Sequence, residues 1–236
     1  MAKAYSFNQL FYEAWLILRK DPIVFAPMLL FSMLVTLAER LLPMPLKPLE
    51  KPFFIFMGLS TLVSLWFQLW TLAMVWQSSK DEDVNVAASF KLACRTFPSV
   101  FFLLLLLGVI MGGFGYAAAL GWQSWPQVKW LMAFLGGVVV TLFVLYSEFL
   151  PVAVVVDGMN TRYSLLLVTR IFRWYAWPIF KYFVVLVGLL SLSALMAESV
   201  KVLVFLPPLI QGFTAAVILA FTYRFYLQLT RIDVVS

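Results

Sequence analysis

Six long apolar segments run along the chain, and no other feature constrains its fold as strongly. They lie at about 22–42, 53–76, 99–120, 130–150, 179–197 and 202–223. About 20 consecutive apolar residues suffice for a helix to cross the hydrocarbon core of a bilayer. Apolar residues make up 64% of the chain and charged residues 12%, against about half and about a quarter in soluble domains. The sequence therefore predicts an all-α membrane protein with six transmembrane helices in a single polytopic domain, residues 1–236.

Several kinds of site are excluded by the residue types that the chain lacks. It has one cysteine, Cys94, and no histidine. An internal disulfide is therefore impossible, and the usual zinc, haem and triad constellations lack their ligands. No pair of acids has the spacing of a general acid–base couple. We expect no cofactor, no metal and no enzymatic activity.

The positions of lysine and arginine predict the orientation, because cytoplasmic loops of membrane proteins carry the excess of positive charge. With the N-terminus inside, the cytoplasmic set holds twelve of the 17 basic residues. The outer set is Arg40, Lys47, Lys51, Lys129 and Lys201. Both termini are thus expected in the cytoplasm. This distribution accounts for the net charge of +6, so nucleic acid is not expected as a partner. The first residues lack the short apolar core and cleavage site of a signal peptide, so we expect them to belong to the mature fold.

A segment with helical periodicity precedes each odd-numbered span. In the first, apolar residues share one face and Ser6 and Gln9 fit a capping box. The second has Asn85 as its expected cap. The apolar faces comprise Phe7, Leu10, Phe11, Ala14, Ile17 and Leu18 in the first segment, Val86, Phe90, Ala93, Cys94 and Phe97 in the second, and Tyr163, Leu167, Ile171 and Trp174 in the third.

All three segments end at a proline, namely Pro22, Pro98 and Pro178. Proline disfavours helical geometry in the residue before it but is tolerated in the first turn of a following helix. Each proline is therefore a predicted junction, where a helix along the membrane surface turns into one that crosses it. The nearly equal spacing predicts three helical hairpins, each preceded by a cytoplasmic amphipathic interfacial helix, as pseudo-repeats at about 5–77, 83–157 and 160–226.

The interfacial segments carry basic residues that have two interpretations. They anchor the protein on the membrane surface, or they dock a partner such as an ATPase subunit or a lipid headgroup. Candidate partners are thus the lipid bilayer, a cytoplasmic ATPase or another membrane subunit, and a second copy of the chain. The predicted basic face consists of Arg19, Lys20, Lys91, Arg95, Arg170 and Arg173.

Few polar side chains lie within the predicted spans. Glu148 lies well inside the hydrocarbon if its helix continues past Pro151, and at the cytoplasmic end if it does not. Its expected partners are Arg224 and the arginines at 170 and 173. Gln68 and Gln211 either form interhelical hydrogen bonds or converge with Glu148 on a polar cavity.

Glycine, alanine and proline residues suggest how the helices pack. Gly108 and Gly112, Ala133 and Gly137, and Gly212, Ala216 and Ala220 recur at four-residue spacing, which permits close helix approach. Pro207 and Pro208 predict a kink, a late helix start or a broken helix in the sixth span.

Three stretches resemble a bacterial membrane protein family related to the membrane domain of glycerophosphoryl diester phosphodiesterases. They are "LFYEAWLILRKDPIVFAPMLL", "VAASFKLACRTFPSVFFLLLLLG" and "EFLPVAVVVDGMNTRYSLLLVTRIF". The resemblance covers nearly the whole chain and implies six helices with interfacial helices between pairs, in a bacterial cytoplasmic membrane. It does not imply phosphodiesterase activity, which belongs to a separate histidine-containing domain.

Two main functions are consistent with these features. The first is a non-enzymatic permease-like or accessory subunit whose cytoplasmic interfacial helices contact a partner or lipid. The second is a self-contained transporter for a small molecule or lipid with a polar site near Glu148. A membrane-embedded enzyme acting on lipid is a weaker alternative, since no nucleophile–base pair is visible. An open cavity that reaches Glu148 would favour transport.

Overall fold

The structure is a computed structural model that describes residues 6–41, 51–80, 83–124, 129–158, 161–200 and 205–235. Helices account for nearly all of these residues. Of the basic residues used for the orientation, Lys3, Lys47 and Lys201 lie outside the described residues, as do the side chains of Lys51, Lys129 and Arg231. The elements, in chain order, are α1 (Phe7–Lys20), η1 (Pro22–Phe25), α2 (Ala26–Leu41), α3 (Lys51–Ser79), α4 (Val86–Ser124), α5 (Lys129–Asp157), α6 (Thr161–Trp174), α7 (Ala176–Ser199) and α8 (Leu206–Val235).

The prediction of six membrane-spanning helices is confirmed by length and composition. Six helical segments of the described chain are long and apolar enough to cross a membrane: Pro22–Leu41, Gly58–Ser79, Val86–Phe114, Trp130–Asp157, Ala176–Ser199 and Leu206–Thr230. The protein is therefore a multi-pass membrane protein. Without water in the bilayer core, backbone polar groups must pair within the segment, which helices achieve.

Helix α8 is the centre of the fold. Helices α1, α2, α3, α5 and α7 all pack against it. Phe221 and Phe225 of α8 form ring contacts with Phe7 of α1 and with Tyr182 of α7, and Phe149 of α5 contacts both Tyr182 and Phe225. This aromatic layer joins helices from the start, the middle and the end of the chain.

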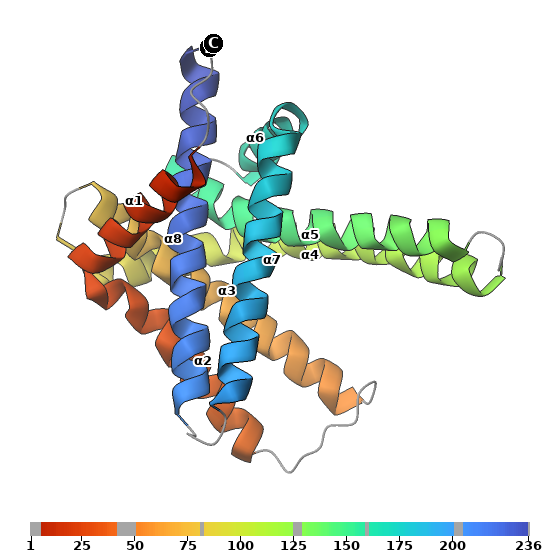
Figure 1. The fold of residues 1–236 in the computed structure, drawn as a ribbon, viewed down its shortest axis with the longest axis horizontal. Coiled ribbons are helices and arrows are strands. Elements are labelled where there is room, and N and C mark those ends of the chain that lie inside the picture. The colour runs from red at the N-terminus through yellow and green to blue at the C-terminus, as the bar shows by residue number, and fades with distance from the viewer. Residues whose placement is uncertain are drawn as a thin grey trace.

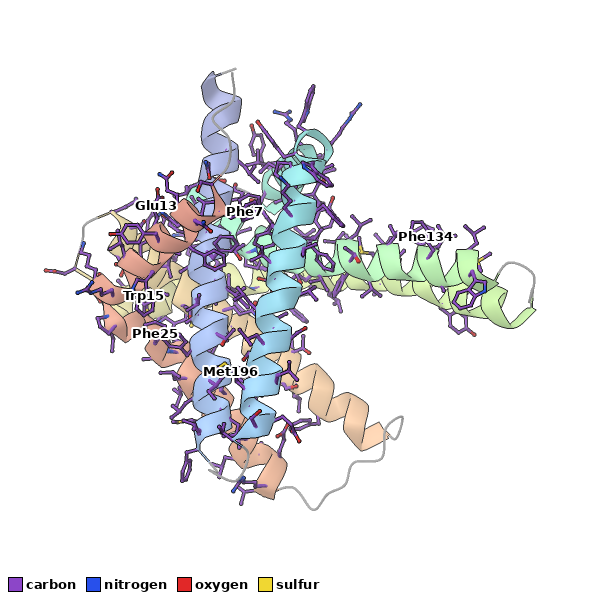
Figure 2. The ribbon with its side chains drawn as sticks, viewed as in Figure 1. Phe7, Glu13, Trp15, Phe25, Phe134 and Met196 are labelled. Carbon is purple, nitrogen blue, oxygen red and sulfur yellow. The ribbon has the colours of Figure 1, made fainter. Side chains whose placement is uncertain are left out.

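Helices α4 and α5 form an arm that leaves the core (Figure 1). They lie side by side and run across the view, whereas α7 and α8 run up and down it, so the two pairs are steeply inclined to each other. We call residues 101–124 of α4 and 129–148 of α5 the arm. Several of its described side chains are uncovered: Phe102, Val109, Phe114 and Phe134 are each more than 60% exposed, and Figure 2 shows Phe134 projecting from the arm.

Two of the three predicted proline junctions coincide with helix starts. Pro22 opens η1, and Pro178 lies in the first turn of α7. Pro98 does not mark a junction, because α4 continues through it from Val86 to Ser124 as one helix. A proline inside a helix removes one backbone hydrogen bond, and here the neighbouring turns keep the helix intact. The segment before Pro98 is thus the first part of the third span itself.

The helix caps agree with the sequence. The Ser6 Oγ accepts a hydrogen bond from the backbone N–H of Gln9 at 3.4 Å, although the Gln9 side chain donates to Glu13 instead of completing the capping box. The Asn85 Oδ1 accepts from the N–H of Ala88 at 2.9 Å.

Helix α8 starts at Leu206, so Pro207 and Pro208 stand in its first turn and the broken-helix interpretation is wrong.

The predicted apolar faces fare unequally. The face predicted for α1 is buried or partly buried at every position. In the first turns of α4, Val86, Phe90 and Cys94 are exposed, and in α6 the buried positions are Ser164, Val168 and Ile171, whereas Tyr163 and Trp174 are exposed. The buried face of α6 is therefore rotated from the prediction, with Ser164 and Val168 buried in place of Tyr163 and Trp174.

The line of small residues on α8 lets it approach α2 closely. Ala216 and Ala220 are fully buried. A Cβ atom added at Gly212 would lie 2.8 Å from the Cα of Leu29 and from the carbonyl oxygen of Met28. Gly112 and Gly137, by contrast, have no atom within 4 Å of an added Cβ, so neither of them makes a contact as tight as that of Gly212.

We predict that Gly212→Ala destabilises the protein by up to about 2 kcal/mol. Overpacking against backbone costs about 1–3 kcal/mol, and the better helix propensity of alanine offsets about 1 kcal/mol of that. Unfolding in mixed micelles titrated with dodecyl sulfate measures the change. Gly188→Ala in α7 is the matched control, since a Cβ there meets nothing within 4 Å. Equal stabilities of the two variants would contradict the close α2–α8 contact.

Candidate functional site

A cavity of about 920 Å³ lies where the arm joins the core, between α2, α3, α4 and α5. Its walls are mainly rings and aliphatic side chains, including Phe31, Phe101 and Phe143. Polar side chains also line it, among them Gln68 and Glu148. Two members of the predicted polar site therefore meet at one cavity.

Glu148 reaches the cavity because α5 does not stop at Pro151. The helix runs on to Asp157, and residues 149–155 are all buried. Glu148 consequently lies within the span Trp130–Asp157 and not at its end, which is the embedded alternative considered above. Its side chain is partly open to the cavity, but its Oε2 atom is enclosed and accepts no hydrogen bond from the described residues.

Gln68 offers a second acceptor. Its amide nitrogen donates to the Ser64 Oγ at 3.2 Å, one turn earlier on α3. This bond lies within one helix, so the interhelical hydrogen bond considered for Gln68 is not formed by its amide nitrogen. The amide oxygen remains as a hydrogen-bond acceptor in the cavity wall.

Gln68 and Glu148 lie toward the same end of the cavity. Trp66 and Trp70 of α3 contact the ring of Phe90, which places the second half of α3 beside the start of α4. A Cβ added at Gly108 would lie 3.6 Å from the ring of Phe143, so α4 and α5 face each other there. Glu148, further along α5, is displaced from that level toward the start of α4.

The other two members of the predicted site lie elsewhere. Gln211 is exposed on α8 and does not line the cavity. Arg224 does not pair with Glu148; its Nη2 atom lies 2.6 Å from the Oε2 of Glu13 on α1. Arg170 and Arg173 are exposed on α6, and Glu148 forms no ion pair with either of these described side chains. The expected partners of Glu148 were wrong because α1 covers α8 and takes up its arginine.

Pro151 removes a donor next to Glu148. Proline has no N–H, so the carbonyl of Ser147, four residues earlier, lacks its usual helical hydrogen bond. The Ser147 hydroxyl is also engaged, since it donates to the carbonyl of Val144 at 2.7 Å. Around Glu148 the cavity wall therefore presents acceptor oxygens.

Pro151 also has a counterpart on α4. The contact between Gly108 and Phe143 places these two residues at the same level of the helix pair. At an equal distance from it toward the core, Pro98 of α4 lies level with Ala153 of α5, which is within about one turn of Pro151. Each helix of the pair thus carries a proline at the base of the arm.

One side of the cavity is open. Leu105 and Val109, which line it, are 50% and 67% exposed. Because these residues lie on the arm, within a candidate span, the opening faces sideways from the helices and not along their ends.

Polar contacts that the sequence did not reveal connect the helices outside the cavity. Ser78 of α3 donates to Asp21 at 2.5 Å, and Ser79 shares a hydrogen bond of 2.5 Å with Tyr223 of α8. Tyr226 of α8 donates to Asp157 at the end of α5. Gly158, directly after Asp157, adopts a positive φ of 57°. The partners in these polar contacts come from distant helices, so no local pattern could have predicted them.

The predicted basic face is exposed at every position: Arg19, Lys20, Lys91, Arg95, Arg170 and Arg173. Lys20 also donates to the carbonyl of Ser78 at 3.5 Å. Among the described residues, no group of three or more histidine, cysteine, aspartate or glutamate side chains could hold a metal ion.

Compared with protein-family models, with curated proteins and with solved structures, the chain matches none. The resemblance to the membrane domain of glycerophosphoryl diester phosphodiesterases therefore stays a prediction, and the cavity itself is the basis for a functional proposal.

The pairing of Arg224 can be tested with two double-mutant cycles. We predict a coupling of about 0.5–1 kcal/mol between Glu13→Gln and Arg224→Gln, as for a partly exposed ion pair. Glu148→Gln and Arg224→Gln should be additive within about 0.3–0.5 kcal/mol. The free energy of unfolding in mixed micelles is the measurement. Coupling in the second cycle and not in the first would reverse the assignment.

Proposed function

We propose that this protein is a non-enzymatic, permease-like carrier of the bacterial cytoplasmic membrane that takes a small molecule or lipid-like molecule into the cavity beside Glu148. The observation that supports the proposal is the cavity itself, which reaches an intramembrane carboxyl group. Ionisable residues inside a membrane are expensive and are typical of substrate pathways.

The dimensions and lining of the cavity suit a ligand. Small-molecule sites in proteins have volumes of about 300–1,000 Å³ and mostly apolar walls with a few polar groups. The volume of about 920 Å³ falls within this range. An opening beside Leu105 and Val109 gives access from the side, where lipid would surround the helices. A molecule dissolved in the bilayer could then enter without crossing to the aqueous phase.

The proposed topology is three hairpins with both termini in the cytoplasm and an interfacial helix before the first and the third hairpin. Packing of α2 with α3, α4 with α5 and α7 with α8 is consistent with the hairpins. Spanning helices tilt by about 0–40° from the bilayer normal, whereas the arm is steeply inclined to α7 and α8 (Figure 1). Insertion of all six spans therefore requires the arm to turn toward the core, and the prolines at its base supply a place to bend.

Transport through the cavity can be tested by measuring lipid movement. In proteoliposomes, the protein should speed the passage of an acyl-labelled fluorescent lysophosphatidylethanolamine between leaflets, read as loss of the dithionite-protected signal. Leu104→Trp, which fills the cavity, should return the rate to that of protein-free liposomes.

The matched control is Leu192→Trp, on the exposed side of α7, which should keep the full rate. If Leu104→Trp moves the lipid as fast as the unchanged protein, the cavity is not the route and the proposal fails.

A second function is supported by the exposed side of α6. Arg170 and Arg173 are exposed together with Trp174, which is 72% exposed, and Tyr163. Basic residues beside exposed tryptophan and tyrosine are typical of a helix that lies at the membrane surface and contacts anionic lipid headgroups. We propose this contact as the role of the basic face, whether the protein works alone or as an accessory subunit.

The single cysteine provides a direct test of the proposed orientation. Cys94 is exposed and free, and it lies between the basic residues Lys91 and Arg95. We predict that a membrane-impermeant maleimide labels Cys94 in inside-out vesicles and not in right-side-out vesicles.

Cys94→Ser is the blank for this measurement, and detergent-opened vesicles give complete labelling. Labelling from the outer face alone would overturn the proposed topology.

A further inference from the structure

The groups around Glu148 are hydrogen-bond acceptors that lack donors. The Glu148 Oε2 is enclosed and accepts nothing from the described residues. The amide oxygen of Gln68 is free to accept, because its amide nitrogen is the group that bonds Ser64. The carbonyl of Ser147 has lost its helical donor to Pro151. A ligand that satisfies these three oxygens must therefore donate hydrogen bonds.

None of the described residues that line the cavity carries a positive charge. Arg224, the cation expected beside Glu148, lies 2.6 Å from Glu13. Glu148 has no ion pair or hydrogen bond with the described part of the chain. An unpaired carboxylate is costly away from water, so a cationic ligand group would stabilise it more than a neutral one.

The rest of the cavity suits an apolar body. Phe31, Phe101, Leu104 and Phe143 line it, and Leu105 and Val109 stand at its open side. A chain that extends from the polar end past these residues would remain in contact with apolar surface as far as the lipid. The cavity is therefore polar at the Glu148 end and apolar toward its lateral opening.

We propose that the ligand is a single-chain amphiphile with an ammonium head, whose cation binds the Glu148 carboxylate while its alkyl chain lies along the aromatic wall. This inference rests on the proposed function and adds the chemical class of its substrate. Alkylamines and ethanolamine lysophospholipids both carry an ammonium group on a single chain, and separate titrations distinguish them.

The test is a binding titration of the full chain in phosphatidylcholine nanodiscs, followed by calorimetry with empty nanodiscs subtracted. The probes are dodecylamine, dodecanol, dodecanoate and lysophosphatidylethanolamine at pH 7, where the amine is protonated. We expect dodecylamine to bind at least about tenfold more tightly than dodecanol, since bonds to charged groups are the stronger ones. Dodecanoate should bind weakest, because its charge has the same sign as that of Glu148.

Three variants make the test specific. Glu148→Gln should abolish the preference for dodecylamine over dodecanol, and Glu148→Asp, which keeps the charge, should retain most of it. Glu39→Gln removes an exposed carboxylate of α2 outside the cavity lining and should leave the preference unchanged. The ratio of the two affinities within each variant is compared, so a general loss of stability does not imitate the effect.

The outcomes separate the two proposals. Equal binding of dodecanol and dodecylamine, or an unchanged preference in Glu148→Gln, overturns the ammonium ligand and leaves the carrier proposal in place. Binding of lysophosphatidylethanolamine but not dodecylamine, with loss in Glu148→Gln, supports the ammonium head and identifies a lipid as its source. If none of the four probes binds, and lipid moves in proteoliposomes no faster than in protein-free liposomes, both proposals are overturned.

Discussion

The close approach of α2 to α8 is the constraint on which the other contacts depend. Because Gly212 has no side chain, the backbone at Met28 and Leu29 can lie directly against it. Further along α8 the buried Ala216 and Ala220 keep its surface low, and beyond them Phe221 and Phe225 contact rings from α1, α5 and α7. The small residues of α8 let α2 approach closely, and its large rings contact α1, α5 and α7. In a bilayer, where apolar burial against lipid gains little, such packing is the main attraction between helices.

The intramembrane carboxyl group depends on a proline that does not end its helix. From the sequence, Pro151 could stop α5 or lie within it, and the two outcomes place Glu148 at the surface or in the interior. The helix continues because the turns after Pro151 are buried in the core, where packing outweighs one lost hydrogen bond. The same residue that leaves the Ser147 carbonyl without a donor thereby holds Glu148 in the cavity wall. The Ser147 carbonyl and the Glu148 carboxyl group thus both add hydrogen-bond acceptors to the same end of the cavity.

How far the sequence predicts the structure depends on the kind of signal. Spans follow from apolar length, and the caps at Ser6 and Asn85 follow from local hydrogen bonding. The rotation of a helix about its axis is harder to predict, because residues facing lipid are as apolar as those facing the core. One of the two alternatives for Gln211 placed it at a cavity with Glu148, and the residue lies outside that cavity. Arg224 was assigned to the wrong carboxylate, since only the tertiary position of α1 brings Glu13 to it.

The pair of prolines at the base of the arm gives the cavity a mechanical property. Pro98 and Pro151 lie within about one turn of each other along the pair, and each helix lacks the backbone hydrogen bond that its proline cannot donate. Bending resistance is lowest there, and the cavity wall formed by Phe101, Gly108 and Phe143 lies just beyond it. The width of the cavity therefore changes with the angle of the arm. Since linkage is reciprocal, a ligand bound in the cavity favours one angle of the arm. A lipid environment that forces a different angle then changes the affinity of the cavity for that ligand.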